Sequence, residues 1–189
     1  MAERITLALA SAFPETARWR GNDVEISPTE AVARWSLRLP PAAADQVGAV
    51  AGLRIAMPIN RAAVAGEVFA ARLGPDEWLL CSPQPAAEEF ERQLAATLGT
   101  RPHALVDVSH RYAALSIEGP RAPDLLAAGC PLDLHAGAFV AGAATRTLLG
   151  KAEIILWRLD GAPAYRVECA RSFAPYVYAF LREAAREFA

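Results

Sequence analysis

The first regular element is marked by strict alternation of apolar and polar side chains. Every odd position from Ala33 to Leu39 is apolar, while positions 34, 36 and 38 carry Arg, Ser and Arg. Neighbouring side chains point to opposite faces of a strand, so this pattern predicts a strand buried on one face only. Pro40-Pro41 ends the strand, and we expect a helix at Ala42–Ala51 because proline is tolerated in a first helical turn.

A hairpin and an amphipathic helix complete the first half of the chain. The strands Val68–Leu73 and Trp78–Cys81 flank Gly74-Pro75-Asp76-Glu77, whose residues favour a turn. Ser82 is then placed to cap a helix that ends at Gly99. Charged residues occupy one face of this helix, and an apolar stripe occupies the other. The stripe consists of Phe90, Leu94 and Leu98.

The second half repeats this order. A strand at Tyr112–Glu118 meets a break at Gly119-Pro120, and a helix follows at Arg121–Ala128. Three strands are predicted after a long loop, at Thr145–Leu149, Ala152–Leu159 and Ala164–Cys169. Ser172 then caps the helix with the clearest apolar stripe in the chain. That stripe consists of Phe173, Tyr176, Val177, Phe180, Leu181 and Ala184.

The two halves therefore share one sequence of elements. Such an internal repeat predicts an α+β fold built from two pseudo-repeated, ferredoxin-like βαββα lobes. The lobes are expected at about residues 31–100 and 101–189, within one domain unit that spans residues 31–189.

Residues 1–30 are expected to form an N-terminal arm. Seven large apolar residues occur before Thr29, but they show no sustained periodicity, and prolines and glycines interrupt them. The repeated halves already supply their own strands and helices, so we expect the arm to lie extended on a partner, with Phe13 and Trp19 as contacts. The alternatives are a partly ordered tail or packing on its own domain.

Composition narrows the class of protein. Hydrophobic residues make up 53% and charged residues 21%, as in a soluble globular domain. The formal net charge of −2 argues against nucleic acid as a partner. No apolar stretch is long enough for a membrane span, and the short apolar run Ile5–Phe13 lacks the charge of a signal peptide. The odd, widely spaced cysteines fit a reducing cytoplasm.

Asp107, Ser109 and His110 place the three residue types of a hydrolytic triad within four positions. In an extended segment Asp107 and Ser109 share one face while His110 points away, and triads combine separated parts of a chain. We therefore interpret the segment as a turn between two strands, held by local bonds from side chain to backbone.

Other searches for chemistry find no motif. A phosphate loop that ends in Gly150-Lys151 would need a glycine at position 145, where this chain has Thr145. It would also need Ser or Thr after Lys151, where this chain has Ala152. The three histidines, at positions 103, 110 and 135, have no second ligand at compact spacing. The sequence thus predicts no catalytic, cofactor-binding or metal-binding residue in this chain.

Two further positions are candidate contacts. Gly119 and Arg121 flank a helix start, where backbone N–H groups and a guanidinium could hold an anion or a partner's carboxylate. The alternative is that this helix start meets only solvent or its own cap. Trp78 lies in a bulky run beside the hairpin turn and is a candidate partner contact, with core packing as the alternative.

Several long segments resemble the gamma subunit family of heterotetrameric sarcosine oxidase. Together they cover most of the chain from about Ala31 to Phe188, in the family's order. The segments are Leu73-Gly74-Pro75-Asp76-Glu77-Trp78-Leu79-Leu80, Val106-Asp107-Val108-Ser109-His110-Arg111, Gly129-Cys130-Pro131-Leu132-Asp133-Leu134-His135, Thr147-Leu148-Leu149-Gly150-Lys151-Ala152-Glu153 and Arg171-Ser172-Phe173-Ala174-Pro175-Tyr176.

This resemblance implies a fold like the folate-binding domain of the glycine-cleavage aminomethyltransferase. It implies a complex that oxidises sarcosine to glycine, with hydrogen peroxide and methylenetetrahydrofolate as further products. FAD, FMN and NAD are then expected in the alpha and beta subunits, tetrahydrofolate in alpha and zinc in delta, and none in this chain. The expected direct partner is alpha, with beta and delta in the same complex.

The alternative functions are a stand-alone folate-binding protein of the aminomethyltransferase or iron-sulfur-assembly type and an adaptor of the same fold. The iron-sulfur-assembly protein carries a Lys-Gly-Cys-Tyr signature. This signature is absent from the present chain, because Gly129-Cys130 is followed by Pro131.

Overall fold

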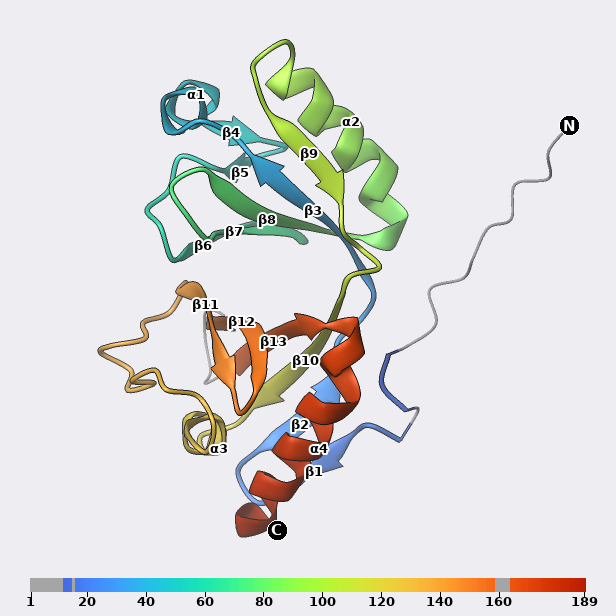
Figure 1. Cartoon of the computed structure of the whole chain (residues 1–189), viewed down its shortest axis with the longest axis vertical. Helices are drawn as coiled ribbons and strands as arrows, with labels where there is room; N and C mark the ends of the chain where they lie inside the picture. Colours follow the sequence, from blue (N-terminus) through green and yellow to red (C-terminus); the bar gives the residue numbers. More distant parts are fainter. Residues whose placement is uncertain (1–11, 15, 159–163) are drawn as a thin grey trace, which may run out of the picture.

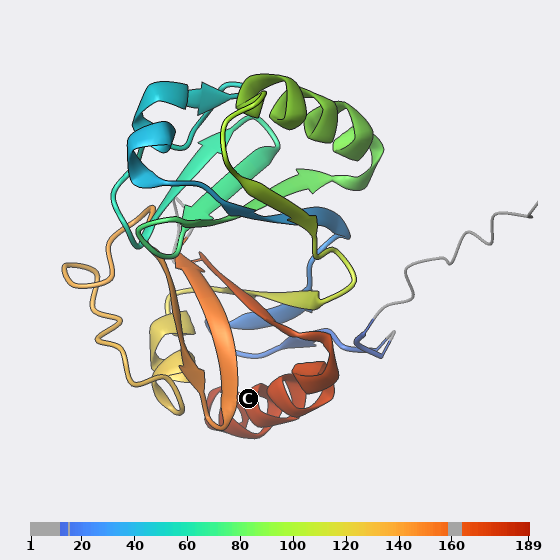
Figure 2. The same ribbon diagram turned by 45° about the horizontal axis from the view of Figure 1, so that its top comes forward.

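Two lobes face each other through their β-sheets. The structure, a computed structural model, describes residues 12–14, 16–158 and 164–189. Figure 1 shows two sheets stacked in the middle of the molecule, with helices α1 and α2 on the outer side of one and α3 and α4 on the outer side of the other. A second view shows the same four layers (Figure 2). None of the described helices is long and apolar enough to span a membrane.

The first lobe is a five-stranded sheet with two helices. Its strands follow the spatial order β6-β7-β8-β3-β9. They are β3 (Val32–Arg38), β6 (Arg61–Ala65), β7 (Val68–Arg72), β8 (Glu77–Pro83) and β9 (Ala104–Asp107). The helices are α1 (Pro41–Val47) and α2 (Ala87–Leu98), with a short ribbon of β4 (Ala49–Val50) and β5 (Leu53–Arg54).

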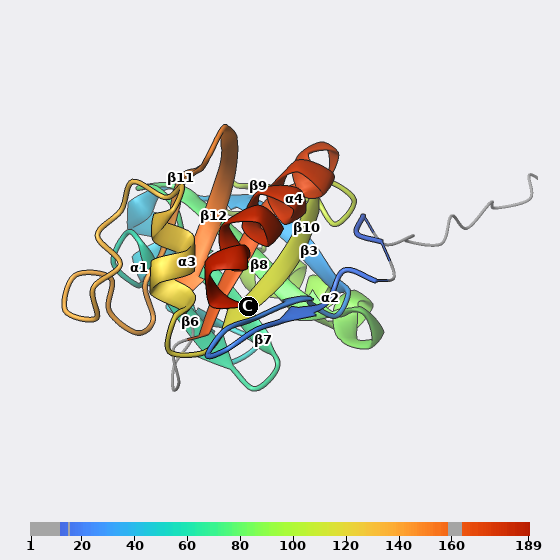
Figure 3. The ribbon, with the colours of Figure 1, turned by 90° about the horizontal axis from the view of Figure 1, so that it is seen from below.

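The second lobe is a six-stranded sheet in the order β1-β2-β10-β13-β12-β11. Its strands are β1 (Trp19–Arg20), β2 (Glu25–Pro28), β10 (Tyr112–Glu118), β11 (Ala144–Leu149), β12 (Ala152–Arg158) and β13 (Ala164–Ala170). The helices are α3 (Ala122–Ala127) and α4 (Ala174–Ala184). Figure 3 shows α3 and α4 lying across the outer face of this sheet.

The order of strands confirms the α+β fold and the internal repeat. The run β6-β7-β8-β3 in the first lobe matches β11-β12-β13-β10 in the second, and all of these neighbours are antiparallel. The predicted βαββα unit has three strands, whereas the two sheets have five and six. In the first lobe, the run that matches the second lobe includes β6, which was not predicted. Its sequence, Arg61-Ala-Ala-Val-Ala65, carries one large apolar residue and no alternation.

The N-terminal segment is part of the second lobe. Strand β2 pairs with β10, with Ile26 opposite Ile117, and Phe13 and Val24 lie in the same core. This corrects the prediction of an arm on a partner: from residue 12 onward, except residue 15, the described segment packs on its own chain. The missing helical period reflects two short strands joined by a turn at Asp23, whose φ is 64°. The apolar residues at positions 5, 7 and 9 lie outside the described residues.

The lobe boundary also differs from the prediction. Strand β9 pairs with β3, so residues up to Asp107 belong to the first lobe. The chain crosses between the lobes twice, at residues 29–31 and 108–111, as the views in Figures 1 and 2 show. The first lobe is thus one continuous segment between the two crossings, whereas the second lobe combines the residues before the first crossing with those after the second.

The two predicted serine caps are wrong. Ser82 is the sixth residue of β8 and fully buried, and α2 begins only after a 3-10 turn at Gln84–Ala86. Helix α4 follows a 3-10 turn at Arg171–Phe173, and Ser172 does not bond to its first turn. The apolar stripes are largely confirmed, since Phe90, Leu94 and Leu98 are buried and so are Val177 and Leu181.

Replacing Ile26 with alanine tests where the N-terminal segment lies. Ile26 is fully buried in the second lobe, so Ile26→Ala should lower the free energy of unfolding by about 2–5 kcal/mol, measured by denaturant unfolding of the isolated chain. The matched control is Ile59→Ala, because Ile59 is half exposed and should lose much less. Equal effects of the two substitutions would contradict the placement of β2 in the core.

Candidate functional site

The seam between the two sheets is the most unusual part of the molecule. Apolar side chains from both inner faces meet there, and they form a core separate from the two beneath the helices. Leu79 and Cys81 come from the first sheet, and Ile155 and Trp157 come from the second. On the inner face of β3, Arg34 is buried and Ser36 is half-buried, whereas Arg38 is exposed. The prediction of a strand buried on one face only is therefore wrong for the first part of β3.

Three charged residues are buried within this seam. Arg34 of β3 donates from Nε to Glu168 Oε2 on β13 at 2.9 Å and from Nη2 to Oε1 at 3.3 Å. Arg166, two residues before Glu168, donates from Nε to Oε1 at 2.7 Å. The exposed fractions are 3% for Arg34, 0% for Glu168 and 7% for Arg166. One carboxylate thus pairs with two guanidinium groups, and its bonds to Arg34 join the two sheets.

The ionisation of this network follows from its surroundings. Burial alone would raise the pKa of the Glu168 carboxyl, but the charges and hydrogen bonds of Arg166 and Arg34 outweigh burial and lower that pKa. Burial and the Glu168 charge raise the pKa of both neighbouring thiols, Cys81 and Cys169, to about 12. Both thiols are therefore protonated at neutral pH and poor nucleophiles.

The Asp107-Val108-Ser109 segment bonds the second crossing between the lobes to strand β3. Ser109 Oγ accepts a hydrogen bond from the Arg34 backbone N–H at 2.9 Å and donates to Asp107 Oδ1 at 2.6 Å. Asp107 Oδ1 also accepts from the Ser109 N–H at 2.8 Å. His110 is exposed and makes no part of this set. The predicted turn with local bonds from side chain to backbone is confirmed.

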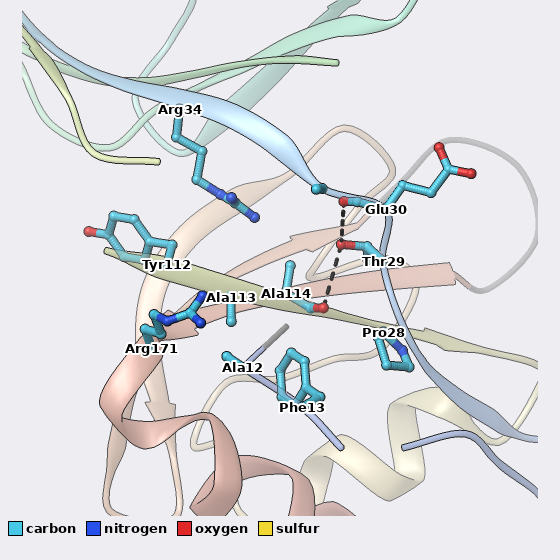
Figure 4. A pocket seen from close by; sticks show the side chains of 11 residues that line it. Ala12, Phe13, Pro28, Thr29, Glu30, Arg34, Tyr112, Ala113, Ala114 and Arg171 are labelled. Carbon is cyan, nitrogen blue, oxygen red and sulfur yellow. Dashed lines mark hydrogen bonds between the residues drawn. The ribbon is translucent and has the colours of Figure 1, made fainter. Parts of the chain in front are cut away.

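A pocket of about 190 Å³ lies beside the first crossing, where residues 28–31 pass between the lobes. Figure 4 shows Arg34 reaching into it from β3 and Arg171 and Tyr112 approaching from the second lobe. The Thr29 hydroxyl lies between the carbonyls of Glu30 and Ala114, at 3.3 and 3.5 Å. This wall of the pocket is therefore formed by the segment that passes between the lobes and by the residues that contact it.

A second cleft, of about 310 Å³, opens between the sheets near the other crossing. Glu77 of β8 accepts from both Nη atoms of Arg146 on β11, which is a second ion pair between the lobes. Arg38 Nη2 lies 3.0 Å from Glu77 Oε2, and Arg111 lines the same cleft. Neither this cleft nor the first pocket is lined by a histidine, cysteine or lysine.

Metal-ligating side chains are also dispersed in the described part of the chain. No three His, Cys, Asp or Glu residues in residues 12–158 and 164–189, apart from residue 15, are grouped so that they could hold an ion. His103, His110 and His135 are all exposed. Asp133 Oδ1 accepts from the His135 backbone N–H at 2.9 Å and so closes a local turn.

The predicted contacts at Gly119 and Arg121 have partners within the chain. The Arg121 N–H donates to the Asp23 carbonyl at 3.1 Å. The Arg121 guanidinium pairs with Asp124 at 2.6 Å and lies over the Phe188 ring. Gly119 has a φ of 113°, and a Cβ there would lie 2.3 Å from the Asp23 oxygen. The glycine therefore serves close packing against the N-terminal segment.

The predicted aromatic contacts are part of the chain's own cores. Trp78 is fully buried and donates from Nε1 to the Ile55 carbonyl at 3.0 Å. Phe13 is buried and packs edge-on against Tyr178, and Trp19 is half buried against the core of the second lobe. Phe13 and Trp78 are therefore not available as surface contacts, and the core-packing alternative describes them.

Comparison with known proteins gives one consistent result. The model of the sarcosine oxidase gamma subunit family matches residues 38–187. The sarcosine oxidase subunit gamma of Arthrobacter sp. is 32% identical over 156 residues, which are 81% of this chain and 75% of that protein. That of Corynebacterium sp. strain P-1 is 37% identical over 117 residues, which are 62% of this chain and only 56% of that protein.

Solved structures extend the likeness to the fold. A chain of heterotetrameric sarcosine oxidase from Corynebacterium sp. U-96 superposes with a TM-score of 0.78 at 28% identity, over 92% of this chain and 90% of that one. The glycine cleavage system aminomethyltransferase T from Bartonella henselae superposes with a TM-score of 0.66 at 13% identity, over 88% of this chain and 47% of that one. The second likeness shows a shared fold alone.

Neutralising the buried carboxylate tests the network. Glu168→Gln leaves two buried guanidinium groups without a counter-charge, so it should lower the free energy of unfolding by about 3–5 kcal/mol at pH 7. Glu153→Gln is the matched control, because Glu153 is exposed and 4.0 Å from Arg146. A loss no larger than that of the control would refute the structural role of Glu168.

The pH dependence of stability tests the second ion pair. The hydrogen bonds from Arg146 lower the pKa of Glu77 below its usual 4.5, against the effect of burial. A lowered carboxyl pKa stabilises the fold above pH 4.5, and that contribution is lost as the pH falls further. The stability difference between the natural chain and Glu77→Gln should therefore be largest near pH 7 and shrink below pH 4.5. A difference independent of pH in chemical denaturation would contradict this assignment.

Proposed function

The chain belongs to the sarcosine oxidase gamma subunit family, and we propose that it is the non-catalytic gamma subunit of a heterotetrameric sarcosine oxidase. The superposition on a chain of the Corynebacterium enzyme carries this proposal, because it spans nearly the full length of both chains. In this role the chain supports the oxidative demethylation of sarcosine to glycine, with formation of hydrogen peroxide and methylenetetrahydrofolate by the complex.

The chemistry of the complex is assigned to the partner subunits. FAD, FMN and NAD are placed in alpha and beta, tetrahydrofolate in alpha and zinc in delta, as the family resemblance implies. In support, the described residues that line the two pockets near the crossings include no histidine, and the three cysteines are buried thiols. Free thiols fit a reducing compartment, so we place the complex in the cytoplasm.

The contact with alpha is proposed at the start of α4. Phe173 is 45% exposed, and Tyr176 beside it is also exposed, although both continue the apolar stripe of the helix. Their rings lie edge to face with centroids 6.5 Å apart. Exposed aromatic pairs of this kind are enriched at the centres of protein interfaces. This site replaces Phe13 and Trp78, which the chain uses for its own cores.

Co-expression with the alpha, beta and delta subunits of the same organism tests whether the chain joins the complex and whether the start of α4 contacts alpha. The tagged chain should recover alpha, and Phe173→Ser should reduce that recovery about tenfold or more, since loss of a central aromatic contact costs over 1 kcal/mol. Ile59→Ser is the matched control, because it also removes an exposed apolar side chain.

Two readouts complete this experiment. Circular dichroism of both variants should match that of the natural chain, because neither side chain is buried. The natural chain alone should be colourless and release no peroxide from sarcosine. Failure of the natural chain to recover alpha, or sarcosine oxidation by the chain alone, would reject the proposed function.

A further inference from the structure

An apolar pocket of about 260 Å³ opens at the far edge of the seam, away from both crossings. Its walls come from both lobes: Val64 and Phe69 from the inner face of the first sheet, and Trp157 and Arg166 from the second. Val64 is 61% exposed, the highest value among the large apolar side chains of the described residues. A cavity of about 150 Å³ already admits benzene, so this pocket has room for an aromatic ring with one substituent.

Two residues that line this pocket carry hydrogen-bond donors without an acceptor. Trp157 Nε1 and Arg166 Nη2 are shielded from solvent and bond to no acceptor within the described part of the chain. A buried N–H without an acceptor costs roughly 1–3 kcal/mol, more for a charged group, so two of them side by side are unusual. The Phe69 ring packs against both groups, 5.2 Å from the Arg166 guanidinium and 5.3 Å from the Trp157 ring.

The charge at this end of the seam is also unbalanced. Arg34 and Arg166 share the single carboxylate of Glu168, which leaves one positive charge in a nearly dry environment. Among the described residues, no acidic side chain lines the pocket. An anion placed there would meet a strong, weakly screened attraction.

We propose that this pocket binds a carboxylate carried on a small apolar group. The apolar group lies against Val64 and the aromatic rings, and the Phe69 ring turns aside so that the carboxylate accepts from Arg166 Nη2 and Trp157 Nε1. The ligand is either a free aromatic acid or a carboxylate of a partner chain. The inference stands apart from the proposed subunit role, since it rests on this chain alone.

Benzoate is the probe, and the indole N–H signal of Trp157 in nitrogen-15 NMR of the full chain is the readout, assigned with Trp157→Phe. Benzoate should shift this signal saturably, whereas benzamide, its neutral counterpart, should bind about tenfold or more weakly because it lacks the charge. Val64→Glu places a like charge at the pocket and should weaken benzoate about tenfold or more.

Two matched variants separate charge from shape and position. Val64→Gln has the size of the glutamate without its charge and should bind benzoate nearly as the natural chain does. Val106→Glu adds the same charge at an exposed valine on β9, outside the pocket, and should also leave binding unchanged. No saturable shift, equal affinity for benzamide, or equal binding by Val64→Glu and Val64→Gln would overturn the proposal.

The source of the carboxylate is decided by repeating the titration on the chain in its assembled complex. Loss of benzoate binding there identifies a partner chain's carboxylate as the natural occupant. Retained binding identifies a free acid.

Discussion

The bridge of Glu168 between Arg34 and Arg166 is the constraint on which the two-lobed arrangement depends. An ionised carboxylate without exposed surface is tolerated only if guanidinium groups compensate the lost hydration, and one of these comes from the opposite sheet. Separating or shifting the sheets would leave a buried charge unpaired. The network therefore selects one relative position of lobes whose apolar inner faces alone would pack less specifically. The Glu77–Arg146 pair at another point of the seam adds to the same selection.

Most regular elements could be predicted from the sequence, because period and turn chemistry determine them locally. Strand β3, the β7–β8 hairpin and the three strands of the second half agree with their predicted ranges to within one residue at each end, except that β8 extends to Pro83 instead of Cys81. The N-terminal segment could not be placed in this way. Its core position depends on pairing with β10, about 90 residues later, and a four-residue strand such as β2 has too few residues to show a period.

The seam was harder to predict than the fold. Arg34 alternates with apolar residues, which is the pattern of a solvent-facing position, and only the second sheet buries it. Glu168 did carry a signal: it follows Arg166 by two residues in a strand otherwise rich in buried apolar residues. The Ser109 turn was predictable because its bonds are local, whereas its bond to the Arg34 N–H joins residues 75 positions apart. Family membership rests on segments along the whole chain, so it did not require any of these contacts.

The subunit role is tested most directly by hydrogen exchange of the backbone amides, measured by mass spectrometry on the isolated chain and on the chain within the co-expressed complex. A subunit with its contact at the start of α4 should show slower exchange in the complex at residues 171–180, while β3 and β13, which are buried in the chain itself, should exchange alike in both states. Identical exchange over the whole chain in the two samples would contradict the account.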